Sequence, residues 1–205
     1  MAATADDVTD YIKFFFEVDR EKHPHDQFEL RLNDKRGHLD ADQEKRTRPP
    51  GGARLWHLLH GYLTNFYRTQ IPANRHLPIM FSPYISLAAF NKDDANKSEF
   101  PGVAEGDLRR LVKEDTDEVY LLQARINGRG LTSLRLAGRA DDINITPNNV
   151  LGLDAGKYDV YYDGHFVKLE PLPPGDHLIE SRGYAPNFEN DVRYSVYTRA
   201  GRFPK

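Results

Sequence analysis

The chain has 205 residues, with 28 Lys and Arg against 31 Asp and Glu, a formal net charge of −3, and no cysteine. This length suits one domain with a full core, and the charge balance argues against nucleic acid as a partner. The absence of cysteine excludes disulfides, thiol catalysis and Cys-based zinc sites. No apolar run reaches the roughly 18–20 residues that a membrane span needs, so we expect no transmembrane segment.

The first ten residues, MAATADDVTD, are acidic and lack the apolar stretch of a signal peptide. We therefore expect a cytoplasmic protein, or a secreted one if the sequence is a trimmed mature form. The 13 prolines, 15 glycines and 11% aromatic residues suit a β-rich protein with many turns.

The first predicted element is a helix over residues 4–20. Thr4 is a suitable N-cap, and Asp6 and Asp7 fall in the first turn, where the helix dipole favours acids. Pro24 is expected to end the helix. One stripe of this helix is apolar and consists of Val8, Tyr11, Ile12, Phe15 and Val18.

Residues 21–53 are polar and rich in charge, and they end in Pro49-Pro50-Gly51-Gly52. We interpret them as a long polar loop with one short strand at 28–32. Loops of this length inside a compact domain are commonly functional. This loop is therefore a candidate lid over a site.

Residues 54–200 show short strand patterns separated by turns, and we assign them to a sandwich. Asn127-Gly128 is typical of a two-residue hairpin turn. The strands are expected at 55–63, 65–71, 77–81, 119–126, 131–136, 143–145, 177–181 and 192–197, with a short additional helix at 105–115. The whole chain, 1–205, is predicted to be one mainly β domain, a jelly-roll-like β-sandwich with an N-terminal α-helix.

The strongest local signal is Asp163-Gly164, between YDVYY and HFVKL. Asp-Gly favours a type I′ turn, which predicts a hairpin over residues 158–169. In such a hairpin Asp159 would form a cross-strand ion pair with Lys168. The core face would carry Tyr158, Val160, Tyr162, His165, Val167 and Leu169.

Three segments, 55–83, 118–131 and 148–183, resemble a family of bacterial β-sandwich proteins that often carry secretion signals and have no established activity. The most specific part is Asp163-Gly164 followed by the run Pro171-Leu172-Pro173-Pro174-Gly175-Asp176-His177. The resemblance implies a fold and no activity. The chain departs from the family pattern in lacking its usual cysteines and in carrying Phe14, Phe15 and Phe16 where tryptophan is common.

His23, His25 and Glu29 form the sharpest chemical motif. Two histidines at i and i+2 on an extended segment point the same way, and a nearby carboxylate could complete a metal site. The spacing resembles the first motif of cupins, and His177 after Pro174-Gly175 loosely resembles the second. A divalent transition metal on His23, His25, Glu29 and His177 is one interpretation. The other is a polar loop with solvated histidines, and a His177 that bonds the backbone of its turn.

Aromatic side chains with polar tips on a sheet face are used by sugar-binding surfaces. Tyr161, Tyr162 and His165, with Trp56 from an earlier strand, are therefore candidate ligand-binding residues. Ordinary core and cross-strand packing is the alternative.

The sequence lacks the Gly-x-Ser-x-Gly elbow, the P-loop, the dinucleotide fingerprint and the His-Glu-x-x-His zinc motif. Two hypotheses of different class follow. The first is a non-catalytic protein that binds carbohydrate or another small polar molecule on an aromatic-lined sheet face or under the 21–53 loop. The second is a small, metal-dependent, cupin-like enzyme that uses the His/Glu cluster.

Overall fold

Two β-sheets and two α-helices make up the computed structural model, which describes residues 2–17, 56–58, 63–72, 78–147, 149, 152–186 and 188–199. The first sheet has the strand order β1-β3-β7-β6, and the second has the order β2-β9-β8-β4-β5. β1 pairs with β3 and β2 with β9 in parallel, and the other described strand pairs are antiparallel. This architecture confirms the predicted mainly β sandwich. Its jelly-roll type stays a prediction.

Several strands are longer than the sequence patterns indicated, whereas the N-terminal helix and the strands at 56–58 and 121–126 are shorter. The helices are α1 (Ala5–Phe16) and α4 (Glu105–Asp117), with a 3-10 turn η3 (Ala95–Lys97). The strands are β1 (Trp56–Leu58), β2 (Leu63–Pro72), β3 (Ile79–Asn91), β4 (Leu121–Ile126), β5 (Arg129–Leu131), β6 (Leu134–Ile145), β7 (Gly156–Leu169), β8 (Gly175–Ala185) and β9 (Phe188–Arg199).

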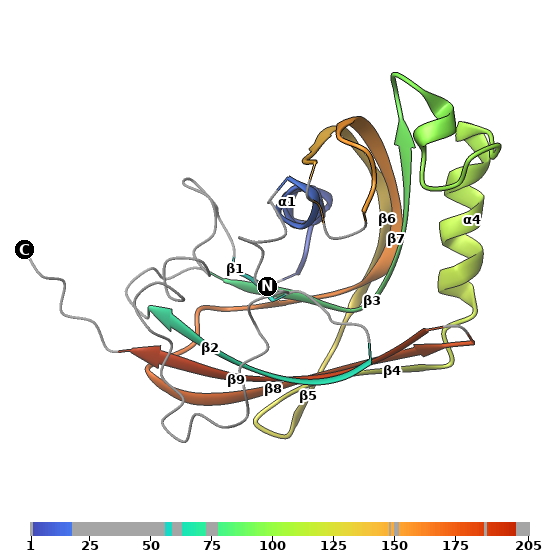
Figure 1. Cartoon of the computed structure of the whole chain (residues 1–205). Helices are drawn as coiled ribbons and strands as arrows, with labels where there is room; N and C mark the ends of the chain where they lie inside the picture. Colours follow the sequence, from blue (N-terminus) through green and yellow to red (C-terminus); the bar gives the residue numbers. More distant parts are fainter. Residues whose placement is uncertain are drawn as a thin grey trace, which may run out of the picture.

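The first sheet is strongly curved, and the helices lie on its two sides. α1 lies inside the curve of β6 and β7, and α4 stands on the opposite side of β3 and β7 (Figure 1). The second sheet packs on the same side as α4, further along the strands. Each contact has its own apolar cluster, so the curved sheet is covered on both faces.

α1 fills the inside of the curve with four residues of the predicted apolar stripe; the fifth, Val18, lies outside the described residues. Val8, Tyr11, Ile12 and Phe15 are buried against the sheet, as is Phe16. Thr4 is the N-cap, as predicted, and with Asp7 it forms a capping box in which each side chain bonds the other residue's backbone N–H. The helix ends at Phe16, four residues before the predicted end. The predicted stop at Pro24 and the whole 21–53 loop, with its strand at 28–32, lie outside the described residues.

β7 runs without interruption through Asp163-Gly164, so the predicted hairpin is wrong. Both residues pair with β3 on one side and β6 on the other. Gly164 is required for space, because a Cβ there would lie 2.8 Å from the Tyr84 carbonyl oxygen and 2.9 Å from the Ile85 Cα. Pairing with two flanking strands outweighs the local preference of Asp-Gly for a turn, because a central strand satisfies its backbone groups on both edges.

The continuous strand changes which side chains share a face. The side toward α1 carries Tyr158, Val160, Tyr162 and Phe166. The side toward α4 and the second sheet carries Tyr161, Val167 and Leu169. The predicted hairpin placed Val167 and Leu169 on the Tyr162 side and Phe166 on the Tyr161 side. These assignments are wrong beyond residue 163, because the strand continues there without a turn.

The predicted ion pair between Asp159 and Lys168 does not form. Lys168 Nζ lies 2.8 Å from Asp7 of α1, and Asp159 lies 3.4 Å from Lys92 and 3.8 Å from Arg139. Residues nine apart on one straight strand are too far apart to pair. In the tertiary structure both side chains therefore have other partners than each other.

Among the remaining predictions, one turn is confirmed and two strands are longer than predicted. The Asn127-Gly128 turn is confirmed, with φ of 48° and 77°. The predicted short strands at 131–136 and 143–145 are largely one strand, β6, and the predicted strand at 77–81 is the start of the long β3. β6 carries a bulge between Ala140 and Ile143, which hid its continuity from a period-2 pattern.

Candidate functional site

The proposed metal ligands are not brought together in the described part of the chain. His23, His25 and Glu29 lie outside the described residues. His177 is the third residue of β8 and is described, and its ring lies between Asn127 and Pro173. Among the described residues, no group of three or more His, Cys, Asp or Glu side chains is placed to hold a metal ion.

The hydrogen bonds around His177 fix its tautomer. The Asn127 Oδ1 accepts the Leu178 backbone N–H at 2.8 Å, which turns Asn127 Nδ2 toward His177 Nδ1 at 3.3 Å. His177 Nδ1 therefore accepts, and Nε2–H donates to the Pro173 carbonyl oxygen at 2.8 Å. Both ring nitrogens are engaged, so in this arrangement His177 holds its turn, as the alternative interpretation predicted, and has no lone pair for a metal.

The candidate ligand residues on β7 do not form one aromatic surface. Tyr161 is buried under α4, where its hydroxyl donates to Glu105 Oε1 at 2.7 Å. Tyr162 is buried on the opposite face, against α1. His165 is half-buried, and Trp56 lies in β1, where only the backbone is described. The two tyrosines therefore serve as core residues in this structure.

Arg135 of β6 is the centre of a dense polar cluster at the C-terminal end of α4. Its Nε and Nη2 donate to the two carboxylate oxygens of Asp163, each at 2.8 Å, and its Nη1 donates to Asp117 at 2.7 Å. The hydrogen bonds that Arg135 donates to Asp163 raise the pKa of Arg135, so the guanidinium stays charged. Thr116 also donates to the Asp163 carbonyl oxygen at 3.0 Å. The cluster fastens α4 to β6 and β7.

The same cluster contains a serine next to a histidine. Ser133 Oγ lies 3.5 Å from His165 Nδ1, and burial together with the charge of Arg135 lowers the pKa of His165. A catalytic triad also needs a carboxylate that orients the histidine. Both oxygens of the nearby Asp163 bond Arg135 instead. The arrangement is therefore not an assembled triad.

The outer face of the second sheet is an open surface built by the described strands β4, β8 and β9. Burial alternates along β4, β8 and β9, so every second residue points away from the first sheet. We call this surface the β4–β8–β9 outer face and define it by Leu121, Gln123, Arg125, Glu180, Arg182, Tyr184, Glu189, Asp191 and Arg193.

One end of the β4–β8–β9 outer face is aromatic. Tyr120, just before β4, is 67% exposed, the largest value among the described large hydrophobic side chains. Its ring lies 6.3 Å from the ring of Tyr184, and its N–H bonds the Tyr184 carbonyl oxygen at 3.0 Å. Leu121, also exposed, lies opposite Tyr184 in the sheet register.

A row of hydrogen-bonding side chains lies next to this aromatic end. Gln123, Arg182 and Asp191 are register neighbours across the three strands. Arg182 Nε donates to Asp191 Oδ1 at 3.0 Å, and this hydrogen bond raises the pKa of Arg182. The row therefore offers a fixed guanidinium, a carboxylate and an amide beside an open aromatic ring.

Sequence reasoning missed Tyr120 and Tyr184. The signal for Tyr184 is the alternation over residues 179–185, where Ile179, Ser181 and Gly183 point inward and Arg182 and Tyr184 outward. The position of Tyr120 could not be read from that pattern, because it precedes the strand and depends on how α4 joins the sheet.

No helix in the described residues is long and apolar enough to cross a membrane. The comparisons with known proteins give no relative, since no family model, curated protein or solved structure matches the chain.

Proposed function

We propose that the protein is a non-catalytic carbohydrate-binding β-sandwich protein, and that the sugar lies on the β4–β8–β9 outer face at its Tyr120–Tyr184 end. The observation that carries this proposal is the exposed Tyr120 ring beside Tyr184, next to the hydrogen-bonding row of Gln123, Arg182 and Asp191.

An exposed tyrosine ring beside a half-buried one suits the apolar face of a sugar ring. The C–H groups of a pyranose pack on an aromatic ring, and a phenol keeps a polar tip for water or ligand. Tyr184 is half-buried, so the sheet fixes its orientation, whereas Tyr120 leaves most of its surface open to a ligand. Pre-ordered rings reduce the entropy that binding must overcome.

The charge of the β4–β8–β9 outer face favours an uncharged ligand. Three arginines, Arg125, Arg182 and Arg193, stand against three acids, Glu180, Glu189 and Asp191, so the face has no formal net charge. Arg182 pairs with Asp191 at 3.0 Å, and Arg193 lies 3.8 Å from Glu180. Interspersed donors and acceptors suit the hydroxyls of a neutral sugar, whereas a single-signed patch would select an ion.

The openness of the face supports binding rather than catalysis. Hydrolytic sites place their acids where water is controlled and pKa values are shifted. The acids of this face lie on an open sheet surface, and Asp191 and Glu180 are held by arginines.

The test is a glycan array with the full chain, followed by calorimetric titration of the best sugar. We expect Tyr184→Ala and Tyr120→Ala each to weaken binding about tenfold, which corresponds to about 1.4 kcal/mol, the upper part of the range for an aromatic contact. Leu178→Ala is the matched control, because Leu178 is exposed on the same sheet face near its other end. An array without a binder, or equal affinities for all three variants, would overturn the proposal.

A further inference from the structure

Two buried oxygen atoms between the sheets have no hydrogen-bond partner among the described residues. They are the hydroxyl oxygen of Ser181 in β8 and the Oδ1 of Asn190 in β9. Ser181 is 1% exposed and Asn190 is 0% exposed, so bulk solvent does not reach them. Buried polar atoms in folded proteins are almost always paired with protein groups or with ordered water.

The two residues are neighbours on one face of the second sheet. Ser181 lies opposite Val192, and Gly183 lies opposite Asn190, so Ser181 and Asn190 occupy diagonal positions on adjacent strands. Both positions belong to the inward-facing set of β8 and β9. Diagonal positions on adjacent strands lie about 7–8 Å apart, a gap that a small molecule hydrogen-bonded to both side chains can bridge. The two unpaired oxygens therefore border the same part of the interior.

β3 carries a bulge between Phe81 and Tyr84, which faces these residues from the other sheet and fixes the amide of Asn190. Asn190 Nδ2 donates to the Pro83 carbonyl oxygen at 2.8 Å. The same oxygen fits against Gly183, where an added Cβ would lie only 2.2 Å away. Flipping the amide would set two oxygens against each other. Oδ1 must therefore face away from Pro83, and its missing partner cannot be explained by a wrong amide orientation.

We infer that Ser181 and Asn190 hold one internal water molecule, or a neutral molecule of that size, between the two sheets. Oδ1 can only accept, so the bound molecule must donate to it, and a hydroxyl both donates and accepts. Water meets both requirements and commonly bridges such groups inside proteins. A charged ligand is excluded, because no ionised side chain among the described residues bonds either oxygen and an unpaired ion is costly to bury. The inference is independent of the proposed sugar site, which lies on the outer face of the same sheet.

A crystal structure and solution NMR of the full chain test the site directly. We expect one ordered water within about 2.6–3.2 Å of both oxygens, and cross-relaxation between that water and the Ser181 amide proton. A direct hydrogen bond from the Ser181 hydroxyl to Asn190 Oδ1, with no water between them, would overturn the inference.

The variant Ser181→Ala gives a second, opposite-signed test. If the hydroxyl holds a water, its removal deprives the water of a partner, and the urea midpoint of unfolding falls. If the hydroxyl is unsatisfied, its removal relieves a cost, and the midpoint rises, which would contradict the inference. Ser195→Ala is the matched control: Ser195 is half-buried on the outer face of β9, and no change of midpoint is expected there.

Discussion

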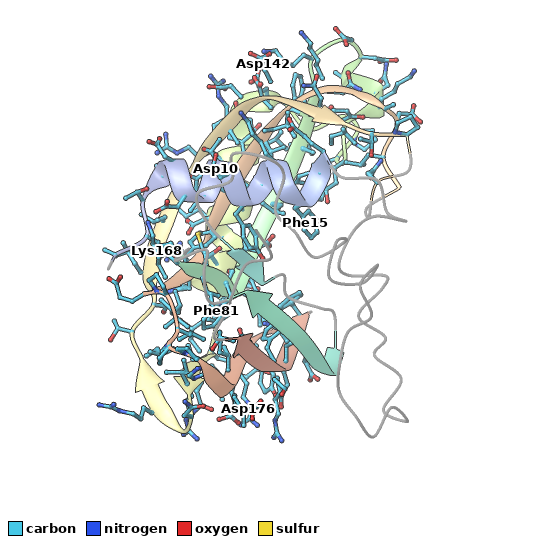
Figure 2. The ribbon with its side chains drawn as sticks, turned by 90° about the vertical axis from the view of Figure 1, so that its left-hand side faces the viewer. Asp10, Phe15, Phe81, Asp142, Lys168 and Asp176 are labelled. Carbon is cyan, nitrogen blue, oxygen red and sulfur yellow. The ribbon has the colours of Figure 1, made fainter. Side chains whose placement is uncertain are left out.

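Lys168 Nζ lies 2.8 Å from Oδ2 of Asp7, and this contact joins β7 to the first turn of α1. The two side chains are only 10% and 8% exposed. The same oxygen of Asp7 accepts the backbone N–H and the hydroxyl of Thr4. Figure 2 shows Lys168 near one end of α1 and Phe15 near the other. The ion pair therefore fixes where the helix enters the curved sheet.

We expect Lys168→Met to destabilise the protein by about 3–5 kcal/mol, because it leaves the Asp7 charge buried without its cation. Urea unfolding at neutral pH measures the loss. The double variant Lys168→Met/Asp7→Asn should recover part of it. Lys113→Met, on the exposed surface of α4, is the control and should change little. A loss as small as that of the control would show that the pair does not fix α1.

The Asp7 pair also predicts a pH dependence. Burial by itself would raise the pKa of Asp7, but the hydrogen bonds from Lys168 and Thr4 outweigh it and hold the pKa below its ordinary value. A lowered pKa in the folded state gives stability that is present above about pH 4, the unfolded value, and is lost as the pH falls through the folded value. Wild type should therefore lose more stability than Asp7→Asn between about pH 4 and pH 2. Parallel curves for the two proteins would contradict this.

Gly164 separates a continuous strand from a hairpin. A type I′ turn tolerates asparagine at the glycine position, whereas the observed strand leaves no room for any Cβ. We expect Gly164→Asn and Gly164→Ala each to cost at least about 1–3 kcal/mol, the usual cost of overpacking. Gly130→Ala is the control, because nothing lies within 4 Å of a Cβ built there. Thermal unfolding of the three variants measures these losses. A Gly164→Asn protein as stable as wild type would favour the hairpin.

Arg135 is expected to be a stability residue. Arg135→Met should cost about 2–3 kcal/mol, less than a fully buried pair, since the Arg135 side chain is 36% exposed while that of Asp163 is 4% exposed. Asp163→Asn in the Arg135→Met background should recover part of the loss, because it removes the buried Asp163 charge that has lost its cation. Arg110→Gln is the control on the exposed side of α4, where the arginine has only local partners. Chemical denaturation measures wild type and the three variants, and a double variant no more stable than Arg135→Met would argue against a coupled pair.

Glu99 predicts a stabilising substitution. Its Oε2 accepts the Ala89 backbone N–H at 3.0 Å, and burial raises its pKa above the ordinary value. A carboxyl with a raised folded pKa favours the folded state below about pH 4.3, and this stabilisation is lost as the pH rises through the folded pKa. Glu99→Gln keeps an acceptor for Ala89 and removes the half-buried charge. It should therefore be more stable than wild type at pH 7, with a smaller difference near pH 4. Equal stabilities of wild type and Glu99→Gln at pH 7 would contradict this prediction.

Sequence patterns predicted the features that depend on neighbouring residues in the chain. The Thr4 cap, the apolar stripe of α1 and the Asn127-Gly128 turn are all of this kind. Each is decided within a few residues, where hydrogen-bond reach and side-chain period leave few alternatives.

The candidate site was harder to predict than the fold class. Tyr161 and Tyr162 looked like a polar aromatic surface, but α4 covers one and α1 covers the other. The open aromatic side chain is Tyr120, and its exposure follows from where the chain leaves α4 and enters the second sheet. Solvent exposure is a property of the assembled layers, so alternation alone shows which residues share a face and not which face stays open.

The sequence by itself determined a mainly β protein with an N-terminal amphipathic helix, because composition and residue period act locally. Only the tertiary structure decided that Asp163-Gly164 is the middle of a strand. Asp-Gly has a real preference for a turn, but β3 and β6 pair with both edges of β7, and Arg135 satisfies the Asp163 carboxylate. Those partners lie about 30 to 80 residues away in the chain, and their combined hydrogen bonds outweigh a preference worth about 1 kcal/mol.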